Sequence, residues 1–376
     1  MAAPLPTAVS PNGNLLRGGA EIFPFGIYHT SWIGERYGDA RDQDMLAIHD
    51  NGLRILKTSL DPTSRQSDFT LLDDAARRGT GVMAELYLPA LGTLIDRMKS
   101  YPAIISWQIG DDFNVTTSKN YCPPELLKER HKLALAHDPH HVTYASGGSA
   151  PVARYRSFKD YQGCVNMIGI QCYPVDNKPD FPDQQMLELC FERFQSRASE
   201  IEGLSIVPIA NLQSFSWTER GILPTPSESR NMLYGALAAG VKGVLYYTFY
   251  DGTDIKGQVT LSDQDPALWD EIGKQSKEIN QLAPFLLKGT RRALPSNAEH
   301  VHMFLWENDK KKLLVVFSTD RSTARDLHST AIPDSAGQKL TPLFANRPAG
   351  LELKGGILSG RIQPEEVHVY SVMEVN

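Results

Sequence analysis

Long apolar runs are missing from this sequence of 376 residues. No stretch reaches the roughly 18 apolar residues that a helix needs to cross a bilayer, so we expect no contact with a membrane. The chain starts MAAPLPTAVSPNGN, without the basic segment and apolar core of an intact signal peptide. A mature N-terminus with an added Met would have such a start. The localisation is therefore open, with a secreted or periplasmic protein as one possibility.

Clusters of basic residues are missing as well. The net charge of −6 is spread along the chain, and no Lys/Arg-rich stripe is present that would neutralise phosphates. The sequence thus predicts no nucleic-acid partner. A neutral or weakly charged ligand fits this balance better than a polyanion. Nothing in the sequence indicates the oligomeric state.

Metal and cofactor motifs are also absent. Cys122, Cys164, Cys172 and Cys190 have neither C-x-x-C nor zinc-ligand spacing, so we interpret them as structural, with a disulfide as the less favoured alternative. The histidines form no H-E-x-x-H group, and no G-x-G-x-x-G loop follows a strand. We therefore expect no catalytic metal and no cofactor.

What the sequence does contain is a regular alternation of elements. Eight short apolar or aromatic runs, typical of strands, occupy residues 25–32, 53–60, 81–88, 103–112, 141–146, 166–174, 206–215 and 243–251. Helical patterns lie at 39–52, 71–79, 123–139, 183–203, 228–240 and 266–286. This series predicts an α/β fold, a (β/α)8 TIM barrel over residues 21–285. An open doubly wound sheet is the alternative, which the missing phosphate loop disfavours.

The pattern changes after residue 288. Apolar residues then recur with period two, between turns marked by Asn-Asp, Gly and Pro, and no helical pattern intervenes. Residues 289–376 are predicted to form a small C-terminal antiparallel β-sandwich packed on the barrel.

Alternation within the barrel strands sorts their side chains. Outward residues must be apolar because they face the helices. Ile105 and Trp107 are accordingly expected to point outward, and Tyr87 inward. The polar inward set is Lys57, Glu85, Gln108, Asp112, Gln171, Tyr173, Asn211 and Gln213. Burying so many polar groups costs stability unless they bind a ligand or one another around buried water. In this fold ligands bind at the C-terminal mouth, and amide, carboxylate and aromatic groups suit a carbohydrate.

Three segments resemble a glycosidase family. YPAIISWQIGDDF (101–113) is similar to the strand-four signature of clan A glycoside hydrolases, whose final Glu is the general acid/base. NMIGIQCYP (166–174) and GALAAGVKGVLYYTFYD (235–251) resemble later strands of the same barrels. The resemblance covers about residues 24–285 and implies an O-glycosyl hydrolase.

The sequence departs from that pattern at three positions. Asp112 stands where the family has the acid Glu, and Asp111 stands in place of the usual Asn. The strand that supplies the nucleophilic Glu ends in Gln213, and an amide cannot form a glycosyl ester. The retaining mechanism is therefore not carried over intact, and inversion is slightly favoured.

Four carboxylates are catalytic candidates. Asp112 is the expected general acid, since an apolar neighbourhood would raise its pKa. Glu85 and Asp251 are candidates for base or nucleophile, and Glu219 is a weaker one. The substrate-binding candidates are Lys57, Gln171, Tyr173, Asn211, Gln213, Trp217, Tyr247 and His29.

Two other functions remain open. A barrel that has lost its nucleophile would be a non-catalytic carbohydrate-binding protein. A lyase or isomerase that uses Lys57 as a Schiff base is less favoured, because no phosphate loop is visible.

Overall fold

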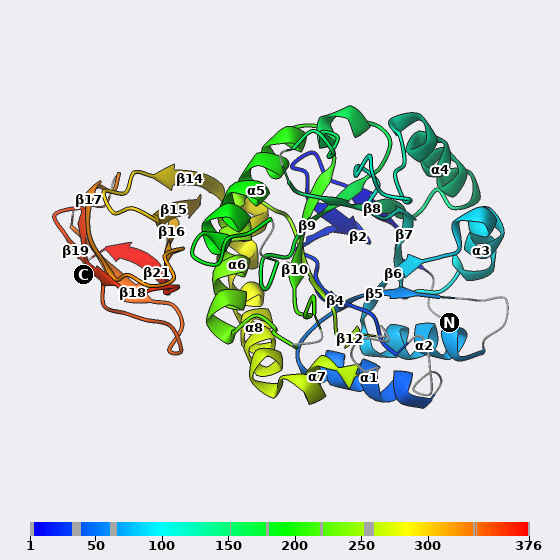
Figure 1. Ribbon diagram of the computed structural model, residues 1–376, viewed down its shortest axis with the longest axis horizontal. Coiled ribbons are helices and arrows are strands. Elements are labelled where there is room, and N and C mark those ends of the chain that lie inside the picture. The colour runs from blue at the N-terminus through cyan, green and yellow to red at the C-terminus, as the bar shows by residue number, and fades with distance from the viewer. Residues whose placement is uncertain are drawn as a thin grey trace.

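The eight predicted strands close into a parallel barrel in the computed structural model, which describes residues 4–31, 39–60, 66–150, 152–177, 180–218, 221–251, 259–333, 335 and 337–374 (Figure 1). The barrel strands are β4 (Phe25–Tyr28), β5 (Ile55–Ser59), β6 (Gly81–Glu85), β7 (Ile104–Gly110), β8 (Val142–Gly148), β9 (Met167–Cys172), β10 (Val207–Gln213) and β11 (Val244–Tyr247). Strands that follow one another in the chain pair in the barrel, and β11 closes it by pairing with β4. The predicted TIM barrel is confirmed.

Helices surround this barrel. They are α1 (Asp39–Asp50), α2 (Gln66–Arg78), α3 (Leu91–Met98), α4 (Pro124–His137), α5 (Met186–Ile201), α6 (Pro226–Ala239), α7 (Leu261–Gln264) and α8 (Pro266–Lys288). The sequence pattern missed α3, which has only 8 residues. Between β8 and β9 the described residues form a single 3₁₀ turn, η2 (Phe158–Tyr161), so this unit lacks the expected α-helix.

Inward and outward side chains of the barrel separate into two cores. Val82, Ala84 and Leu56 pack outward against the helices, as predicted. Ile105 was expected there but packs inside the barrel. The reason is a bulge in β7: Val82 pairs with Ile104 and Met83 with Ser106, so the strand has one extra residue and its alternation shifts.

Tyr87 is a second exception to the alternation. The sequence placed it inside the barrel, yet the side chain is 70 % exposed. Strand β6 ends at Glu85, and Tyr87 precedes the 3₁₀ turn η1 (Leu88–Ala90). Alternation cannot be extended past the end of a strand, because the backbone no longer keeps the extended conformation.

A small sheet that the sequence pattern did not predict covers the N-terminal end of the barrel. It contains β1 (Thr7–Val9), β2 (Leu15–Arg17) and β3 (Ala20–Ile22). Leu15 packs among the inward barrel residues. The Thr7 hydroxyl donates to the carbonyl oxygen of Ile105 at 2.8 Å and accepts from the amide of Val142 at 2.9 Å. The opposite, C-terminal end is where a ligand can enter.

The C-terminal residues form the predicted antiparallel sandwich. The strands are β14 (Thr290–Leu294), β15 (Val301–Asn308), β16 (Lys311–Ser318), β17 (Arg325–Ala331), β18 (Gln338–Pro342), β19 (Glu352–Lys354), β20 (Ile357–Ile362) and β21 (Val367–Glu374). Within the described residues they make one sheet in the order β14-β15-β16-β21-β18 and a second in the order β17-β20-β19. Leu305, Leu314, Leu358 and Val372 belong to the apolar core that the strands of both sheets share.

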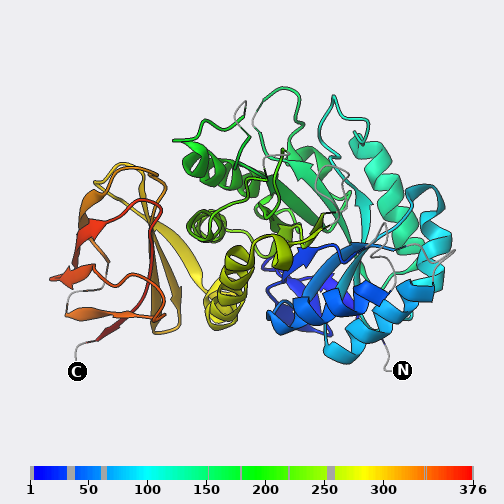
Figure 2. The same ribbon diagram turned by 60° about the horizontal axis from the view of Figure 1, so that its bottom comes forward.

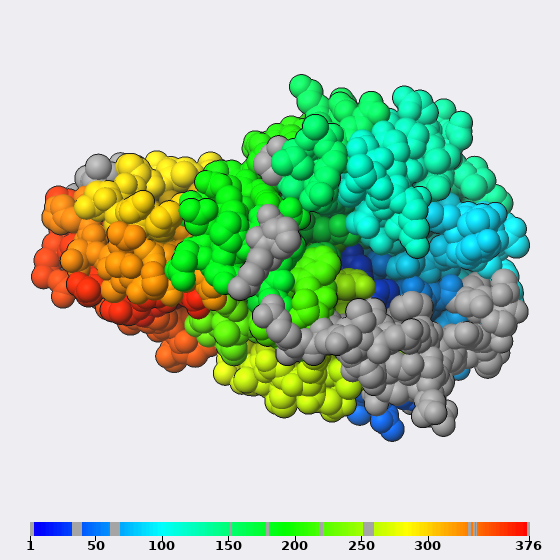
Figure 3. All heavy atoms as spheres, in the orientation of Figure 1, coloured from blue at the N-terminus to red at the C-terminus, as the bar shows by residue number. Residues whose placement is uncertain are grey.

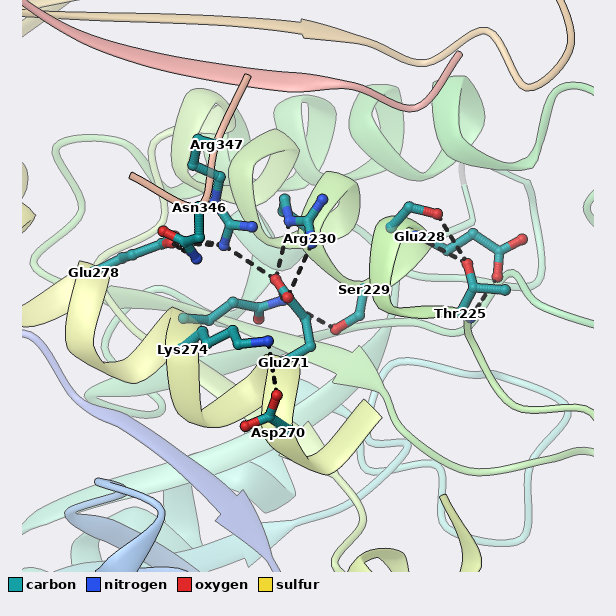
Figure 4. Close-up of polar contacts among 12 residues, drawn as sticks. Thr225, Glu228, Ser229, Arg230, Asp270, Glu271, Lys274, Glu278, Asn346 and Arg347 are labelled. Atoms are coloured by element: carbon teal, nitrogen blue, oxygen red, sulfur yellow. Dashed lines mark hydrogen bonds and ion pairs between the residues drawn. The ribbon is translucent and has the colours of Figure 1, made fainter. Parts of the chain in front are cut away.

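The sandwich lies against the flank of the barrel formed by α5, α6 and α8 (Figures 1 and 2). Phe304 and Phe317 of the larger sheet join the apolar core of the barrel helices. Buried charges reinforce the contact: Arg347 bridges Glu271 and Glu278 of α8 (Figure 4). A contact of this kind, apolar and doubly ion-paired, holds the sandwich in one position on the barrel.

Candidate active site

A cavity of about 690 Å³ opens at the C-terminal mouth of the barrel. Figure 3 views the molecule from this end and shows a hollow between green and cyan segments, with blue atoms at its base. Residues at the ends of the barrel strands β4 to β11 line it together with loops. This volume falls within the ~300–1,000 Å³ typical of small-molecule sites and leaves room for more than one sugar ring.

Eight of the eleven predicted site residues line this cavity. They are His29, Lys57, Glu85, Asp112, Gln171, Tyr173, Trp217 and Tyr247. Asn211 and Gln213 do not line it. The side chain of Asp251 lies outside the described residues, as does Glu219. Asp251 therefore stays a candidate from the sequence alone.

Lys57 and Glu85 form an ion pair on the wall of the mouth, where β5 and β6 end side by side. Lys57 is buried, and its ammonium lies 4.3 Å from the centroid of the Tyr28 ring. Burial alone would raise the pKa of Glu85, but the charges of Lys57 and His29, with hydrogen bonds from Lys57 and Ser59, lower that pKa to about 2. Glu85 is thus an ionised carboxylate. An ammonium held in this way is poorly suited to Schiff-base chemistry, which needs a neutral amine.

Asp111 and Asp112 follow the end of β7 and differ in their surroundings. Asp111 accepts hydrogen bonds from the Ser146 hydroxyl and, at 3.2 Å, from Gln171 Nε2. Asp112 has a backbone φ of 49°, in the left-handed region. Burial and the neighbouring charge of Asp111 raise the pKa of Asp112 to about 6, against a hydrogen bond from Gln171 that lowers it. A carboxyl group with such a pKa can hold a proton near neutral pH.

Aromatic rings form the side of the mouth at β9, β10 and β11. The Tyr173 ring centroid lies 5.2 Å from that of Phe215, 5.9 Å from that of Tyr247 and 6.1 Å from that of Trp217. Trp217 donates from its indole nitrogen to the Tyr173 carbonyl oxygen at 3.2 Å and is 43 % exposed. An exposed indole at the rim offers an apolar face to a sugar ring.

The side-chain amide of Gln213 is hydrogen-bonded to backbone groups of the fold. Its Oε1 accepts from the Val175 amide at 2.8 Å, and its Nε2 donates to the carbonyl oxygens of Val175 and Phe215 at 3.0 Å each. It is fully buried, so these bonds connect the loops that follow β9 and β10. Asn211 lies deeper and bonds the hydroxyl groups of Tyr28 and Tyr144. Neither amide faces the cavity.

Several lining residues were not among the predicted site residues. From the sequence, Asp111 was as well suited to holding the loop after its strand as to chemistry, and Tyr28 lies in a strand too evenly mixed to assign. Tyr155, Asp180, Phe181 and Arg193 belong to the loops after β8 and β9 and to α5. Loop and helix residues follow no strand alternation, so no pattern in the sequence pointed to them.

Other kinds of site find little support in the described residues. No group of three or more His, Cys, Asp or Glu there could hold a metal ion. The four cysteines are buried free thiols. No helix in the described ranges is long and apolar enough to cross a membrane.

Comparison with known proteins finds structures of the same fold, but no match at the level of sequence. No protein-family model matches the chain, and no curated protein sequence matches it. A solved structure titled glycoside hydrolase superposes with a TM-score of 0.69 at 12% identity, covering 98% of this chain and 97% of its own. A β-glucuronidase from an uncultured Clostridium species gives a TM-score of 0.55 at 11% identity over 73% of this chain, which spans 53% of that protein.

An endo-1,4-β-D-mannanase from Thermotoga petrophila gives a TM-score of 0.52 at 10% identity, covering 68% of this chain and 99% of its own. All three proteins are glycoside hydrolases by title. The structural resemblance to glycoside hydrolases expected from the strand motifs is therefore confirmed at the level of the fold. At these identities the likeness extends to the fold alone.

Proposed function

We propose that this protein is a glycoside hydrolase that cleaves an O-glycosidic bond at the C-terminal mouth of its barrel, with Asp112 as the general acid. The observation that carries the proposal is the contrast between two carboxyl groups lining one cavity. The pKa of Asp112 is raised to about 6, while that of Glu85 is lowered to about 2. Pairs of carboxyl groups whose pKa values are pushed apart are the usual arrangement for acid-assisted glycoside cleavage.

In the proposed reaction the glycosidic carbon–oxygen bond breaks as Asp112 delivers its proton to the leaving oxygen. A water molecule attacks the anomeric carbon and loses a proton to a carboxylate or to solvent, so one water is consumed and two free sugar ends are formed. Glu85 would supply negative charge that stabilises the developing oxocarbenium ion and orients the water. Because a carboxylate of such low pKa is a weak base, Asp251 is kept as a second candidate for the base.

Inversion at the anomeric carbon is the outcome that we propose. Retention needs a nucleophilic carboxylate, and the residue at the expected position, Gln213, uses its amide to bond Val175 and Phe215. The lining aromatic residues Tyr173, Trp217 and Tyr247 would bind the apolar faces of sugar rings.

A screen of aryl glycosides and polysaccharides tests the activity. We expect turnover by the wild-type protein, a product of inverted configuration by NMR, and loss of turnover in Asp112→Asn with unchanged melting behaviour. Asp270→Asn is the control, because Asp270 is an exposed carboxylate on α8.

The structural role of Gln213 favours one competing function, a non-catalytic carbohydrate-binding protein. Sugar binding without turnover of any substrate would support that function and reject ours.

A further inference from the structure

The cavity continues beyond the barrel mouth into a side arm. This arm lies between the loop after β8 and the loop that leads from β9 to α5. Its walls are formed by Ser149, Ala150, Tyr155, Asn177, Phe181 and Arg193. Neither Asp112 nor Glu85 belongs to these loops, so the arm is the part of the one cavity whose lining comes from outside the proposed reaction centre.

One wall of the arm is fixed by close packing. A Cβ atom at Gly148 would come within 2.1 Å of Cε1 of Tyr155, so glycine is required for the ring to lie against the backbone. Arg197 donates to the carbonyl oxygens of Ser149 and Ala150 at 3.2 and 2.8 Å. The wall is therefore built before any ligand arrives, which lowers the entropic cost of binding.

The opposite wall presents a guanidinium group in a fixed orientation. The Cζ atom of Arg193 lies 3.8 Å from the centroid of the Phe181 ring, which is buried. Nη2 of Arg193 donates to the carbonyl oxygen of Asp180 at 2.8 Å. Stacking and this hydrogen bond use one face and one edge of the guanidinium. Arg193 lines the cavity, and its remaining N–H groups form no other hydrogen bond with the described residues.

The charge of Arg193 is not neutralised by a carboxylate in the described part of the chain. The nearby Asp180 directs both carboxylate oxygens toward Arg154, at 3.3 Å each. The cavity thus has a positive end at Arg193. The other end has Asp111, Asp112 and the Glu85 carboxylate, the last paired with Lys57.

From this separation of charge we propose that the arm is a subsite for a sugar residue bearing an anionic group, a carboxylate or a sulfate ester, bound by Arg193. The proposal rests on the proposed function for the identity of the ligand as a carbohydrate. A planar guanidinium binds such a group with two parallel hydrogen bonds. The negative end of the cavity would repel an anion, so it would take a neutral ring. The substrate class is then an acidic oligosaccharide with its charge in the arm.

Three hexoses that differ only at C6 test the subsite on the full chain: galacturonate, galactose 6-sulfate and galactose. Binding is measured by titration calorimetry or by NMR for the wild-type protein and for Asp112→Asn. We expect one or both anions to bind about tenfold more tightly than galactose, since a charge-assisted hydrogen bond is stronger than one between neutral groups. The preference should weaken in high salt. The comparison of the two anions distinguishes carboxylate from sulfate.

Arg193→Gln should abolish the preference, and Arg193→Lys should keep part of it. Arg156→Gln is the matched control, because Arg156 lies near the same loop but pairs with Asp160 outside the cavity. Equal binding of the three hexoses, or a preference that survives Arg193→Gln in a folded protein, would overturn the inference and leave Arg193 a packing role on Phe181. The measurement needs no turnover. A preference for the anions without any hydrolysis would thus support the subsite and reject the proposed function. Hydrolysis of neutral glycosides without such a preference would support the proposed function and reject the subsite.

Discussion

Asp111 and Asp112 are consecutive in the chain, yet their carboxyl groups are held in different ways. Asp111 is bonded by Ser146 and Gln171, whereas Asp112 follows it in a left-handed conformation with its pKa raised to about 6. The fixed negative charge of Asp111 is one cause of that raised pKa, after burial. The charge of Asp111 therefore helps the proposed acid, Asp112, to keep its proton near neutral pH.

Asp112→Asn should have an effect that depends on the leaving group. The amide preserves shape but cannot deliver a proton, and general acid assistance is worth ~10²–10⁴-fold. We expect kcat to fall by that factor for glycosides with poorly activated leaving groups. The loss should be much smaller for nitrophenyl glycosides, whose leaving group departs without protonation. Comparison of kcat for the two substrate types checks this. An equal loss on both would assign Asp112 to a nucleophilic or binding role.

Asp111→Asn should shift the pH dependence of activity. Removing the negative charge takes away one cause of the raised pKa of Asp112, so that pKa falls. The acid is active only when protonated, and the alkaline limb of the kcat/KM profile should therefore move to lower pH by roughly one unit. The amide oxygen can still accept from Ser146 and Gln171. Asp160→Asn, which changes an exposed carboxylate of η2, should leave the limb where it is. If the alkaline limb of Asp111→Asn coincides with that of the wild-type protein, the charge of Asp111 does not influence the pKa of Asp112.

Lys57→Met should destabilise the protein, because it leaves Glu85 without its ion-pair partner. Breaking a buried pair costs ~3–5 kcal/mol, and the lower end applies because the Glu85 side chain is 33% exposed. The pKa of Glu85 is depressed from 4.5 to about 2, so the pair stabilises the fold above pH 4.5 and this stability is lost as pH falls toward 2. Chemical denaturation between pH 2 and 7 measures both effects.

The double variant Lys57→Met, Glu85→Gln is the internal control for that series. It removes the unpaired charge, and it should recover part of the stability while losing the dependence between pH 2 and 4.5 that Glu85 causes. A Lys57→Met protein as stable as wild type at neutral pH would contradict the ion pair as a stabilising contact.

Gln213→Glu should not create the missing nucleophile. A carboxylate cannot donate to the carbonyl oxygens of Val175 and Phe215, and it would meet their partial negative charge in a fully buried position. Each group left unpaired costs ~1–3 kcal/mol, so a clear drop in melting temperature is expected. No gain of turnover should accompany it. A stable Gln213→Glu protein with raised activity and a product of retained configuration would contradict this prediction. It would show that the site is a retaining one that lacks only its nucleophilic carboxylate.

The sequence by itself determined the fold and the direction in which the site opens. Each barrel strand is short and apolar, and its neighbours are amphipathic helices, so the period of the pattern identified all eight strands. The same alternation correctly separated Lys57 from Leu56 and Gln171 from Ile170. It works because a strand side chain has only two directions, and one of them faces an apolar helix layer.

Only the tertiary structure decided how these side chains are used. A bulge turned Ile105 inward, and the end of β6 left Tyr87 exposed. Gln213 points into the barrel as alternation requires, but the loops after β10 and after its neighbour β9 take its hydrogen bonds. Arg193 reaches the cavity from α5. Its guanidinium is not paired with the Asp180 carboxylate, because that carboxylate accepts from Arg154 instead. Such outcomes depend on contacts between residues far apart in the chain, which no local period encodes.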